Sequence, residues 1–346
     1  MGHLRIVKSI SHRHTRTKAD KTFNLGLVNF KSDFVCVCPW QIKVLSLRTR
    51  LLKTLYSLFP FDLRGDCSVP PASDGICISC IINFYGRLDL LSGILHSLSL
   101  QNFPRSSFEI VLVEDRGGTE EGRKMADEFA SSLPIVYAPL DRNFGRMGYS
   151  RNFGLAQSRG EYVLFLDDDT VILQEDFLSK LLDVFQSNSE IDALVPHGNA
   201  SYGLVKGKYD FHDPYFMTSR CTAYRRAVLA ELGGFVDDFI GQEDVEYVVR
   251  FHMAGKQVLN VSELEYYHPP LLVGNFRKPM AVGQSFFRVR KRYPFLIWML
   301  LLLNCSRHAP LYLIPWGRFR EMGRFGLGFL FGVVSGLWNK KGLQYG

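Results

Sequence analysis

The chain has 346 residues, 47% hydrophobic and 22% charged, a globular balance that excludes collagen-like, low-complexity and wholly disordered proteins. Its net charge of +7 is unevenly spread: residues 1–64 hold 12 basic and 3 acidic residues, residues 65–276 hold 17 and 30, and residues 277–346 hold 12 and 1. The acidic middle segment argues against a nucleic-acid partner, whereas basic flanks with apolar runs suit an anionic membrane surface.

Two segments precede the main folded domain. Residues 1–40 are polar and basic and lack the apolar region of a secretory signal, which predicts a disordered extension, with an organellar transit peptide as the alternative. Residues 41–59 have apolar side chains at helical spacing and basic side chains mostly off that face. This basic amphipathic helix either lies at a membrane interface or packs on the main domain. With the proline-containing linker that follows, the segment spans 41–74.

The seven cysteines are odd in number and irregularly spaced, which argues against a disulfide framework. Cys77 and Cys80 form a CxxC pair, but they lie in an apolar run that predicts a buried strand, where they would face opposite sides. We therefore expect core thiols rather than a zinc or redox site, and a reducing, cytoplasmic location.

From Gly75 the chain alternates apolar runs with segments of helical spacing, which predicts an α/β fold with a mostly parallel central sheet flanked by helices. This domain is expected to span 75–276. No GxGxxG follows the first strand and no P-loop occurs, which disfavours a dinucleotide site or an NTPase site of those types. The predicted strands are 76–82, 108–113, 134–138 and 162–166, and the predicted helices are 88–100, 119–132, 147–158, 177–185 and 245–253.

Acidic residues follow two of these strands, Glu114-Asp115 after 108–113 and Asp167–Asp169 after 162–166. In such sheets, ligands bind at the carboxyl ends of the strands. Adjacent carboxylates repel one another unless a cation neutralises them, and residues two apart on an extended chain point the same way. Hard oxygen ligands suit Mg²⁺ or Mn²⁺, so we favour a metal site over a solvated turn or a helix cap.

A third acidic cluster, Gly-Gln-Glu-Asp-Val-Glu over 241–246, opens the predicted helix 245–253. Acids are stabilised by the dipole at a helix N-terminus, which is a purely structural explanation. The functional alternative makes one of them a general base that faces a pocket. The helix dipole lowers the pKa of such a carboxyl group while burial raises it, so both interpretations stay open.

Taken in order, these segments resemble the inverting family 2 glycosyltransferases, which have the nucleotide-sugar-binding A-type fold. The resemblance covers roughly residues 75–270. It rests on blocks in the right order and at suitable spacing, including Ile-Ile-Asn-Phe-Tyr-Gly-Arg and an Asp-x-Asp metal motif. The matching blocks are 81–87, 109–115, 150–156, 160–169, 233–239 and 241–246.

The resemblance implies roles for particular residues. Asp115 would contact the nucleotide base, and Asp167 would lie near the ribose and the metal. Asp244 would be the catalytic base, with Glu243 beside it. The whole donor-binding set would be Phe84, Tyr85, Asp115, Arg151, Asp167 and Asp168. The ligands of Mn²⁺ or Mg²⁺ would be Asp169, Asp167 and His268.

The implied function is transfer of a sugar, with inversion, from a nucleotide-sugar donor to a hydroxyl of a glycan or lipid-linked acceptor. Gln284 and Arg288 are one residue too far apart for a Gln-x-x-Arg-Trp motif, which indicates a non-processive enzyme. Two alternatives stay open. One is a non-catalytic nucleotide-sugar-binding scaffold. The other is a sugar nucleotidyltransferase, which would need a glycine-rich basic loop after the first strand.

Residues 277–346 contain two apolar runs, 295–303 and 325–338. A spanning helix needs about 20 apolar residues, so interfacial or re-entrant helices fit better, with the protein peripheral to the inner face of the membrane. The alternative is that these helices pack on the catalytic domain. Glycines at 328, 332 and 336 repeat every fourth residue, which permits close contact with another helix.

Overall fold

The structure is a computed structural model, and it describes residues 47–200, 217–269, 274–315 and 317–338. These residues belong to one compact unit, Leu45–Gly346. The predictions for residues 1–40, which include Cys36 and Cys38, and for the start of the amphipathic segment lie outside the described residues.

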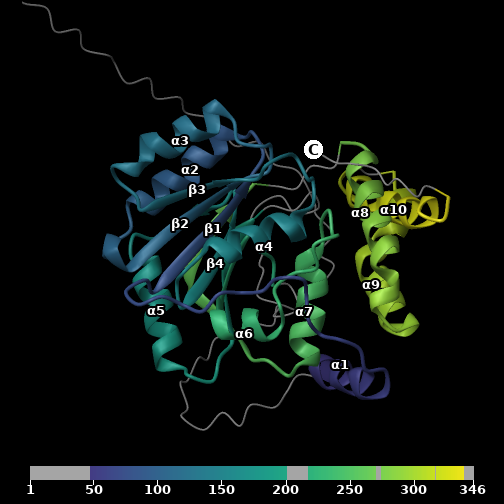
Figure 1. The fold of residues 1–346 in the computed structure, drawn as a ribbon. Helices are drawn as coiled ribbons and strands as arrows, with labels where there is room; N and C mark the ends of the chain where they lie inside the picture. Colours follow the sequence, from purple (N-terminus) through teal and green to yellow (C-terminus); the bar gives the residue numbers. More distant parts are fainter. Residues whose placement is uncertain (1–46, 201–216, 270–273, 316, 339–346) are drawn as a thin grey trace, which may run out of the picture. The chain divides into compact units, whose positions relative to one another are not determined.

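Strands and helices alternate from Ile78 to Asp167, and helices alone follow the last strand (Figure 1). The strands are β1 Ile78–Phe84, β2 Phe108–Glu114, β3 Ile135–Pro139, β4 Tyr162–Asp167, β5 Val171–Ile172, β6 Ala193–Ala200, β7 Cys221–Arg225 and β8 Val258–His268. The helices are α1 Leu47–Leu58, α2 Leu88–Ser99, α3 Glu120–Ala130, α4 Met147–Gln157, α5 Phe177–Ser187, α6 Arg226–Glu231, α7 Glu243–Met253, α8 Arg277–Arg288, α9 Phe295–Ser306 and α10 Gly317–Ser335. Short 3-10 helices are η1 Arg105–Ser107, η3 Val289–Arg292 and η4 Ala309–Leu313.

The described strands form an eight-stranded sheet in the order β3-β2-β1-β4-β7-β6-β8-β5. Strands β3, β2, β1 and β4 are parallel, as are β6 and β8, whereas β7 is antiparallel to both of its neighbours and β5 to β8. The predicted α/β fold with a mostly parallel sheet is confirmed. Strands β5 to β8 lie beyond the last strand that the sequence pattern predicted.

Alternate residues of the central strands face two layers of helices. Ile78, Cys80 and Ile82 pack with α2, α3 and α5, whereas Ile81 packs with α4, α6 and α7. This period of two is the geometry of a strand buried on both faces. Cys77 and Cys80 are free thiols, as expected, and Cys80 is fully buried.

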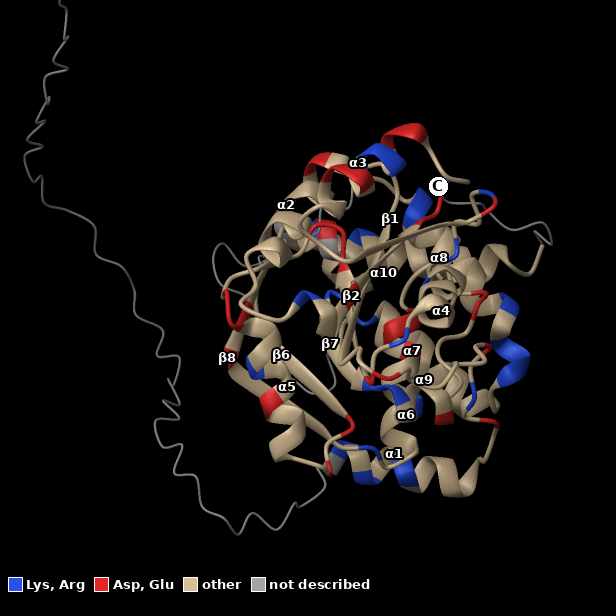
Figure 2. Ribbon diagram, turned by 60° about the vertical axis from the view of Figure 1, so that its left-hand side comes forward, with Lys and Arg blue, Asp and Glu red and all other residues tan. Residues whose placement is uncertain are grey.

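A third hydrophobic core joins the flanking helices to the main domain. Leu52 of α1, Phe239 before α7, Phe286 of α8, Ile297 of α9 and Phe329 of α10 belong to it. Both flanking segments therefore pack on the domain through one face. Their opposite faces are partly apolar and exposed, and α1 also carries basic residues there (Figure 2).

Helices α8 and α10 contact each other closely because glycines line the contact. A Cβ atom added at Gly332 would lie 2.1 Å from the carbonyl oxygen of Met280, and one at Gly283 would lie 2.0 Å from that of Phe329. Gly328 and Gly336 also face α8 residues. The predicted close helix contact is confirmed. No helix among the described residues is long and apolar enough to cross a membrane.

Candidate active site

The predicted acidic residues lie at one edge of the sheet. Asp115 directly follows β2 and Asp167 ends β4, and both strands run parallel to β1, with Asn83 opposite Asp167. His268 reaches the same place from the end of β8, because β5 pairs antiparallel with β8 and puts Val171 opposite Tyr267. The carboxyl ends of the parallel strands thus form the floor of the candidate site.

Asp167, Asp169 and His268 form a group that could hold a metal ion. Their ligand atoms lie within 4.8 Å of one another. His268 Nε2 is 3.0 Å from Asp169 Oδ1 and 3.6 Å from Asp167 Oδ2, while its Nδ1 lies 2.7 Å from the Pro269 carbonyl oxygen. That last contact orients the ring with Nε2 toward the carboxylates, as in many metal sites. Two carboxylates and an imidazole are a donor set that fits Mn²⁺ or Mg²⁺.

The charges of this group are mutually stabilised. Burial alone would raise the pKa of Asp167, but the hydrogen bond from His268 and the charge of Arg151 bring that pKa well below its ordinary value. Burial would lower the pKa of His268, yet its hydrogen bonds to Asp167 and Asp169 raise that pKa to about 9. The site therefore favours a positive charge between its carboxylates.

Asp168 has a different environment from its two neighbours. The residue is buried, and its side chain pairs with Arg87, which follows β1 and also donates from Nη1 to Asp169 Oδ2 at 2.8 Å. Burial raises the pKa of Asp168 to about 7, and Arg87 opposes that rise. The predicted donor contact of Asp168 would have to compete with this ion pair.

Arg151 of α4 links the metal group to the third acidic cluster. Its Nη2 lies 3.1 Å from Asp167 Oδ1, and its Nε lies 2.7 Å from Glu243 Oε1. Both Arg151 and Glu243 are buried. Burial raises the pKa of Glu243 to about 7 despite the arginine. The predicted donor residue Arg151 is thus a buried bridge between two of the predicted motifs.

Glu243 and Asp244 begin α7 and differ in exposure. Glu243 is 2% exposed and is held by Arg151, whereas Asp244 is half-buried and accepts a hydrogen bond from the Ser219 amide at 3.4 Å. Burial raises the pKa of Asp244, and Arg151 opposes the rise. Gln242, just before them, has φ of 63°, the only positive φ of a non-glycine among the described residues. Such strained backbone is concentrated at functional sites.

The predicted base-binding side of the site is formed after β1 and β2. Asp115 Oδ1 accepts a hydrogen bond from the Phe144 amide at 2.9 Å, and burial raises the pKa of Asp115. Tyr85 is exposed, with the guanidinium of Arg116 5.3 Å from its ring centroid and Asn143 donating to its hydroxyl at 3.3 Å. A carboxylate beside an exposed ring is an arrangement that can bind and stack a nucleobase.

One predicted donor residue needs a correction. Phe84 is buried in the core beneath α2, because it falls on the same face of β1 as Ile78, Cys80 and Ile82. Its side chain is a core residue and does not line the donor site. The alternation of the strand already contained this information.

Sequence reasoning missed two basic residues of the site. Arg87 stands in the motif 81–87 without an assigned role, yet it pairs with both Asp168 and Asp169. Arg220 precedes β7. Burial raises the pKa of Asp244, and the positive charge of Arg220 lowers it, as does that of Arg151. The sequence shows only that a charged residue lies next to an apolar strand. It does not show which side chain that residue contacts.

Comparisons with known proteins agree with this geometry. Residues 79–225 match the model of glycosyl transferase family 2. The chain is 24% identical over 224 residues to the poly(ribitol-phosphate) beta-N-acetylglucosaminyltransferase TarS of Staphylococcus aureus, an alignment covering 62% of this chain and 39% of that protein. It is 27% identical over 179 residues to the O-antigen chain rhamnosyltransferase WbaN of Salmonella anatum, covering 46% and 56%. The chain thus spans about two fifths of TarS and just over half of WbaN.

Solved structures show the same fold. The crystal structure of S. aureus TarS 1–349 in complex with UDP-GlcNAc matches with a TM-score of 0.54 at 19% identity, over 75% of this chain and 82% of that one. The mannosyltransferase PcManGT of Pyrobaculum calidifontis, in complex with GDP-Man and Mn²⁺, matches with a TM-score of 0.51 at 15% identity, over 85% and 97%. Residues 79–225 therefore match glycosyl transferase family 2, and the described chain has the A-type fold of these solved structures.

Proposed function

We propose that this chain is a metal-dependent, inverting and non-processive glycosyltransferase that moves a sugar from a nucleotide-sugar donor to a hydroxyl of a glycan or lipid-linked acceptor. One observation carries the proposal. The group Asp167, Asp169 and His268 is joined through the single buried Arg151 to the Glu243-Asp244 pair. The proposed cation site and the Glu243-Asp244 pair are thus connected through Arg151. The names of the similar proteins, and their complexes with nucleotide sugars, support the same activity.

Asp167, Asp169 and His268 would hold the cation, Mn²⁺ or Mg²⁺. When bound, it would neutralise the donor diphosphate and stabilise the charge that develops on the leaving group. Arg87 lies beside Asp169 and would add positive charge on the same side. Asp115 and Tyr85 would bind the nucleobase at the neighbouring strand ends.

Asp244 would act as the general base. The acceptor hydroxyl oxygen forms a bond to the anomeric carbon while the bond from that carbon to the phosphate oxygen breaks, and Asp244 takes the hydroxyl proton. One displacement from the opposite face inverts the anomeric configuration. The raised pKa of Asp244 favours proton transfer, because a base is most effective when its pKa approaches the working pH.

The test is product analysis with a donor panel of UDP-GlcNAc, UDP-glucose, GDP-mannose and dTDP-rhamnose in Mn²⁺. The proposal expects release of nucleoside diphosphate from one donor, and NMR should show an inverted anomeric centre in the product. Binding without release would favour the scaffold alternative. Pyrophosphate release from a nucleoside triphosphate and a sugar phosphate would favour the nucleotidyltransferase. A retained configuration would contradict the single displacement.

We also propose that the protein works at the cytoplasmic face of an anionic membrane, which its C-terminal helices contact peripherally. Leu313, Trp338 and Phe295 are 85%, 75% and 70% exposed, in or beside η4, α10 and α9. Residues 277–346 carry 12 basic residues and 1 acidic residue. Exposed aromatic and aliphatic side chains among lysines and arginines are typical of helices at the surface of an anionic bilayer.

Vesicle flotation tests this surface. The wild type should float with phosphatidylcholine vesicles that contain phosphatidylglycerol, and less with phosphatidylcholine alone. Leu313→Glu should reduce flotation, whereas the matched control Leu173→Glu, also on an exposed leucine, should not. Equal flotation of the two variants would contradict the assigned surface.

A further inference from the structure

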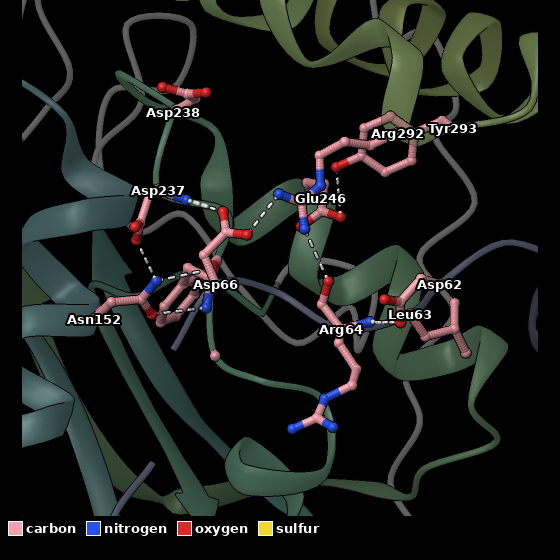
Figure 3. Close-up of polar contacts among 12 residues, drawn as sticks. Asp62, Leu63, Arg64, Asp66, Asn152, Asp237, Asp238, Glu246, Arg292 and Tyr293 are labelled. Carbon is pink, nitrogen blue, oxygen red and sulfur yellow. Dashed lines mark hydrogen bonds and ion pairs between the residues drawn. The ribbon is translucent and has the colours of Figure 1, made fainter. Parts of the chain in front are cut away.

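Residues 62–67, here called the strap, lie outside the family 2 match and pair with the loop 232–239 that leads to α7 (Figure 3). The strap amides of Gly65, Asp66 and Cys67 donate to carbonyl oxygens of the loop at 2.8 to 2.9 Å. A Cβ atom at Gly65 would lie 2.5 to 2.6 Å from three loop carbonyl oxygens. The strap and the loop therefore approach as closely as their backbones allow.

Asp66 connects this loop to the C-terminal segment. Its Oδ2 accepts a hydrogen bond from the Asp237 amide at 2.9 Å. Its Oδ1 accepts one from Arg292 Nη1 at 2.6 Å, and Arg292 Nη2 donates to the Arg64 carbonyl oxygen at 3.0 Å (Figure 3). One carboxylate thus holds the main chain of the loop while an arginine of η3 holds the carboxylate.

The loop is held from its other side by Asn152, the residue after Arg151. Asn152 Nδ2 donates to Asp237 Oδ1 at 2.7 Å and to the Phe235 carbonyl oxygen at 2.8 Å, and its Oδ1 accepts from the Phe235 amide at 2.9 Å. Asp237 is therefore clamped between the strap and α4. Both clamps act on the chain that enters α7 a few residues before Asp244.

The strap itself has a buried anchor. Arg250 Nη1 donates to the carbonyl oxygens of Leu63 and Leu232, both at 2.9 Å, and Arg250 pairs with Glu246 of the same helix. Tyr293, next to Arg292, donates to Glu246 Oε1 at 2.9 Å. The strap, the loop, α7 and η3 are thus cross-linked by polar contacts at both ends of the strap.

We infer that Asp66 is a positioning residue for glycosyl transfer. Together with Arg292 it holds the loop 232–239, and through it the start of α7 with Asp244, in the geometry that transfer requires. The catalytic part of this inference rests on the proposed function. It assigns a role in the reaction to two residues that flank the family 2 match rather than belong to it.

The test compares Asp66→Ala, Asp66→Asn and the matched control Asp62→Ala. Asp62 lies in the same strap, but it accepts a local hydrogen bond, from the Arg64 amide at 2.9 Å. Hydrogen exchange at residues 233–239 reports on the loop without any substrate. Calorimetry with UDP and Mn²⁺ reports on the donor site, and UDP release from UDP-GlcNAc reports on turnover.

Asp66→Ala should speed exchange of the Asp237 amide roughly tenfold or more, because a hydrogen bond to a charged acceptor is lost. Turnover should fall roughly tenfold or more through misplacement of Asp244, while UDP affinity stays unchanged. Asp66→Asn keeps an acceptor oxygen and should recover part of both effects, and Asp62→Ala should match the wild type.

Loop exchange in Asp66→Ala equal to that in Asp62→Ala would overturn the inference, whatever the turnover. A parallel loss of UDP affinity would also overturn it, because Asp66 would then support the fold in general. If the wild type neither binds UDP nor releases it while loop exchange responds as expected, the proposed function fails for this donor and the catalytic role of Asp66 fails with it.

Discussion

Two regions of the molecule are built around a buried arginine that binds a glutamate in the first turn of α7, and they differ in their charge balance. Arg250 pairs with Glu246, and its Nε, Nη1 and Nη2 atoms all donate to that carboxylate or to carbonyl oxygens. Arg151 pairs with Glu243 and Asp167, and Asp244 also lies within its electrostatic reach. Arg250 therefore pairs with one acid, whereas Arg151 lies near several.

We interpret this difference as that between a structural ion pair and the proposed site for chemistry. The Arg250–Glu246 pair is neutral, and each nitrogen of the guanidinium donates a hydrogen bond, as in a structural ion pair. The Arg151 region has a surplus of carboxylates, which protons, neighbouring basic residues or a bound cation must balance. Such an imbalance is costly to folding, and carboxyl groups with perturbed pKa values are concentrated at functional sites.

The largest expected effect is on turnover in the Arg151 region. Asp244→Asn removes the proposed base and should lower transfer by about 10²- to 10⁴-fold, the usual contribution of a general base. Nucleotide affinity should be unchanged, because the donor-side residues remain. Steady-state release of UDP, together with calorimetry, checks both statements, and Asp127→Asn on exposed α3 is the matched control. Full turnover by Asp244→Asn would remove the base assignment.

The second effect is on stability in the Arg250 region. Arg250→Ala leaves Glu246 buried without its partner and should lower the free energy of unfolding by about 3–5 kcal/mol. Lys256→Ala breaks the more exposed pair with Glu231 and should cost about 0–1 kcal/mol. Urea unfolding of both variants measures the difference. If the two variants unfold at the same midpoint, the Arg250 network has no special role in the fold.

A smaller effect is expected at the glycine contact between α8 and α10. Gly332→Ala would force a Cβ atom against the Met280 carbonyl oxygen and should destabilise the protein by about 1–3 kcal/mol. Gly93→Ala in α2 has its nearest neighbour 3.9 Å away and should stabilise by about 0.5–1 kcal/mol. Thermal unfolding gives both signs. Equal shifts would show that the helices can separate at no cost.

A pH dependence of stability is also expected at Glu243. Because its pKa rises from 4.5 to about 7 on folding, the folded protein binds this proton more tightly than the unfolded chain. Its favourable contribution is complete below about pH 4.5 and is lost as the pH rises toward 7. The free energy of unfolding of the wild type should therefore fall relative to Glu243→Gln over this range. Parallel pH profiles would contradict the raised pKa.

The sequence predicted the parallel half of the sheet well, because its buried strands are continuous apolar runs between helices of clear period. The acids at the strand ends followed from the same reasoning, since parallel strands bring their carboxyl ends to one edge. Strands β5 to β8 were not predicted, because β5 has two residues and β8 has a mixed burial pattern.

What the sequence could not show is which distant side chains meet. Arg87 and Asp169 are far apart in the chain, as are Asp66 and Arg292, and neither pair has a local pattern. The bridge from Arg151 to Glu243 also depends on how α4 and α7 pack on the same face of the sheet. Phe84 was assigned to the donor site because it belongs to the motif 81–87. The alternation of side chains along β1 instead predicts the core position that the structure shows.

The central claim is that a divalent cation balances the carboxylate surplus around Arg151 and His268 and in turn binds a nucleoside diphosphate. Calorimetric titration of UDP, GDP and dTDP into wild type and Asp169→Asn, with and without Mn²⁺, tests it most directly. We expect one nucleotide to bind the wild type only with Mn²⁺, and Asp169→Asn to weaken that binding by at least about tenfold. Equal affinity in both proteins, or binding indifferent to Mn²⁺, would contradict the claim.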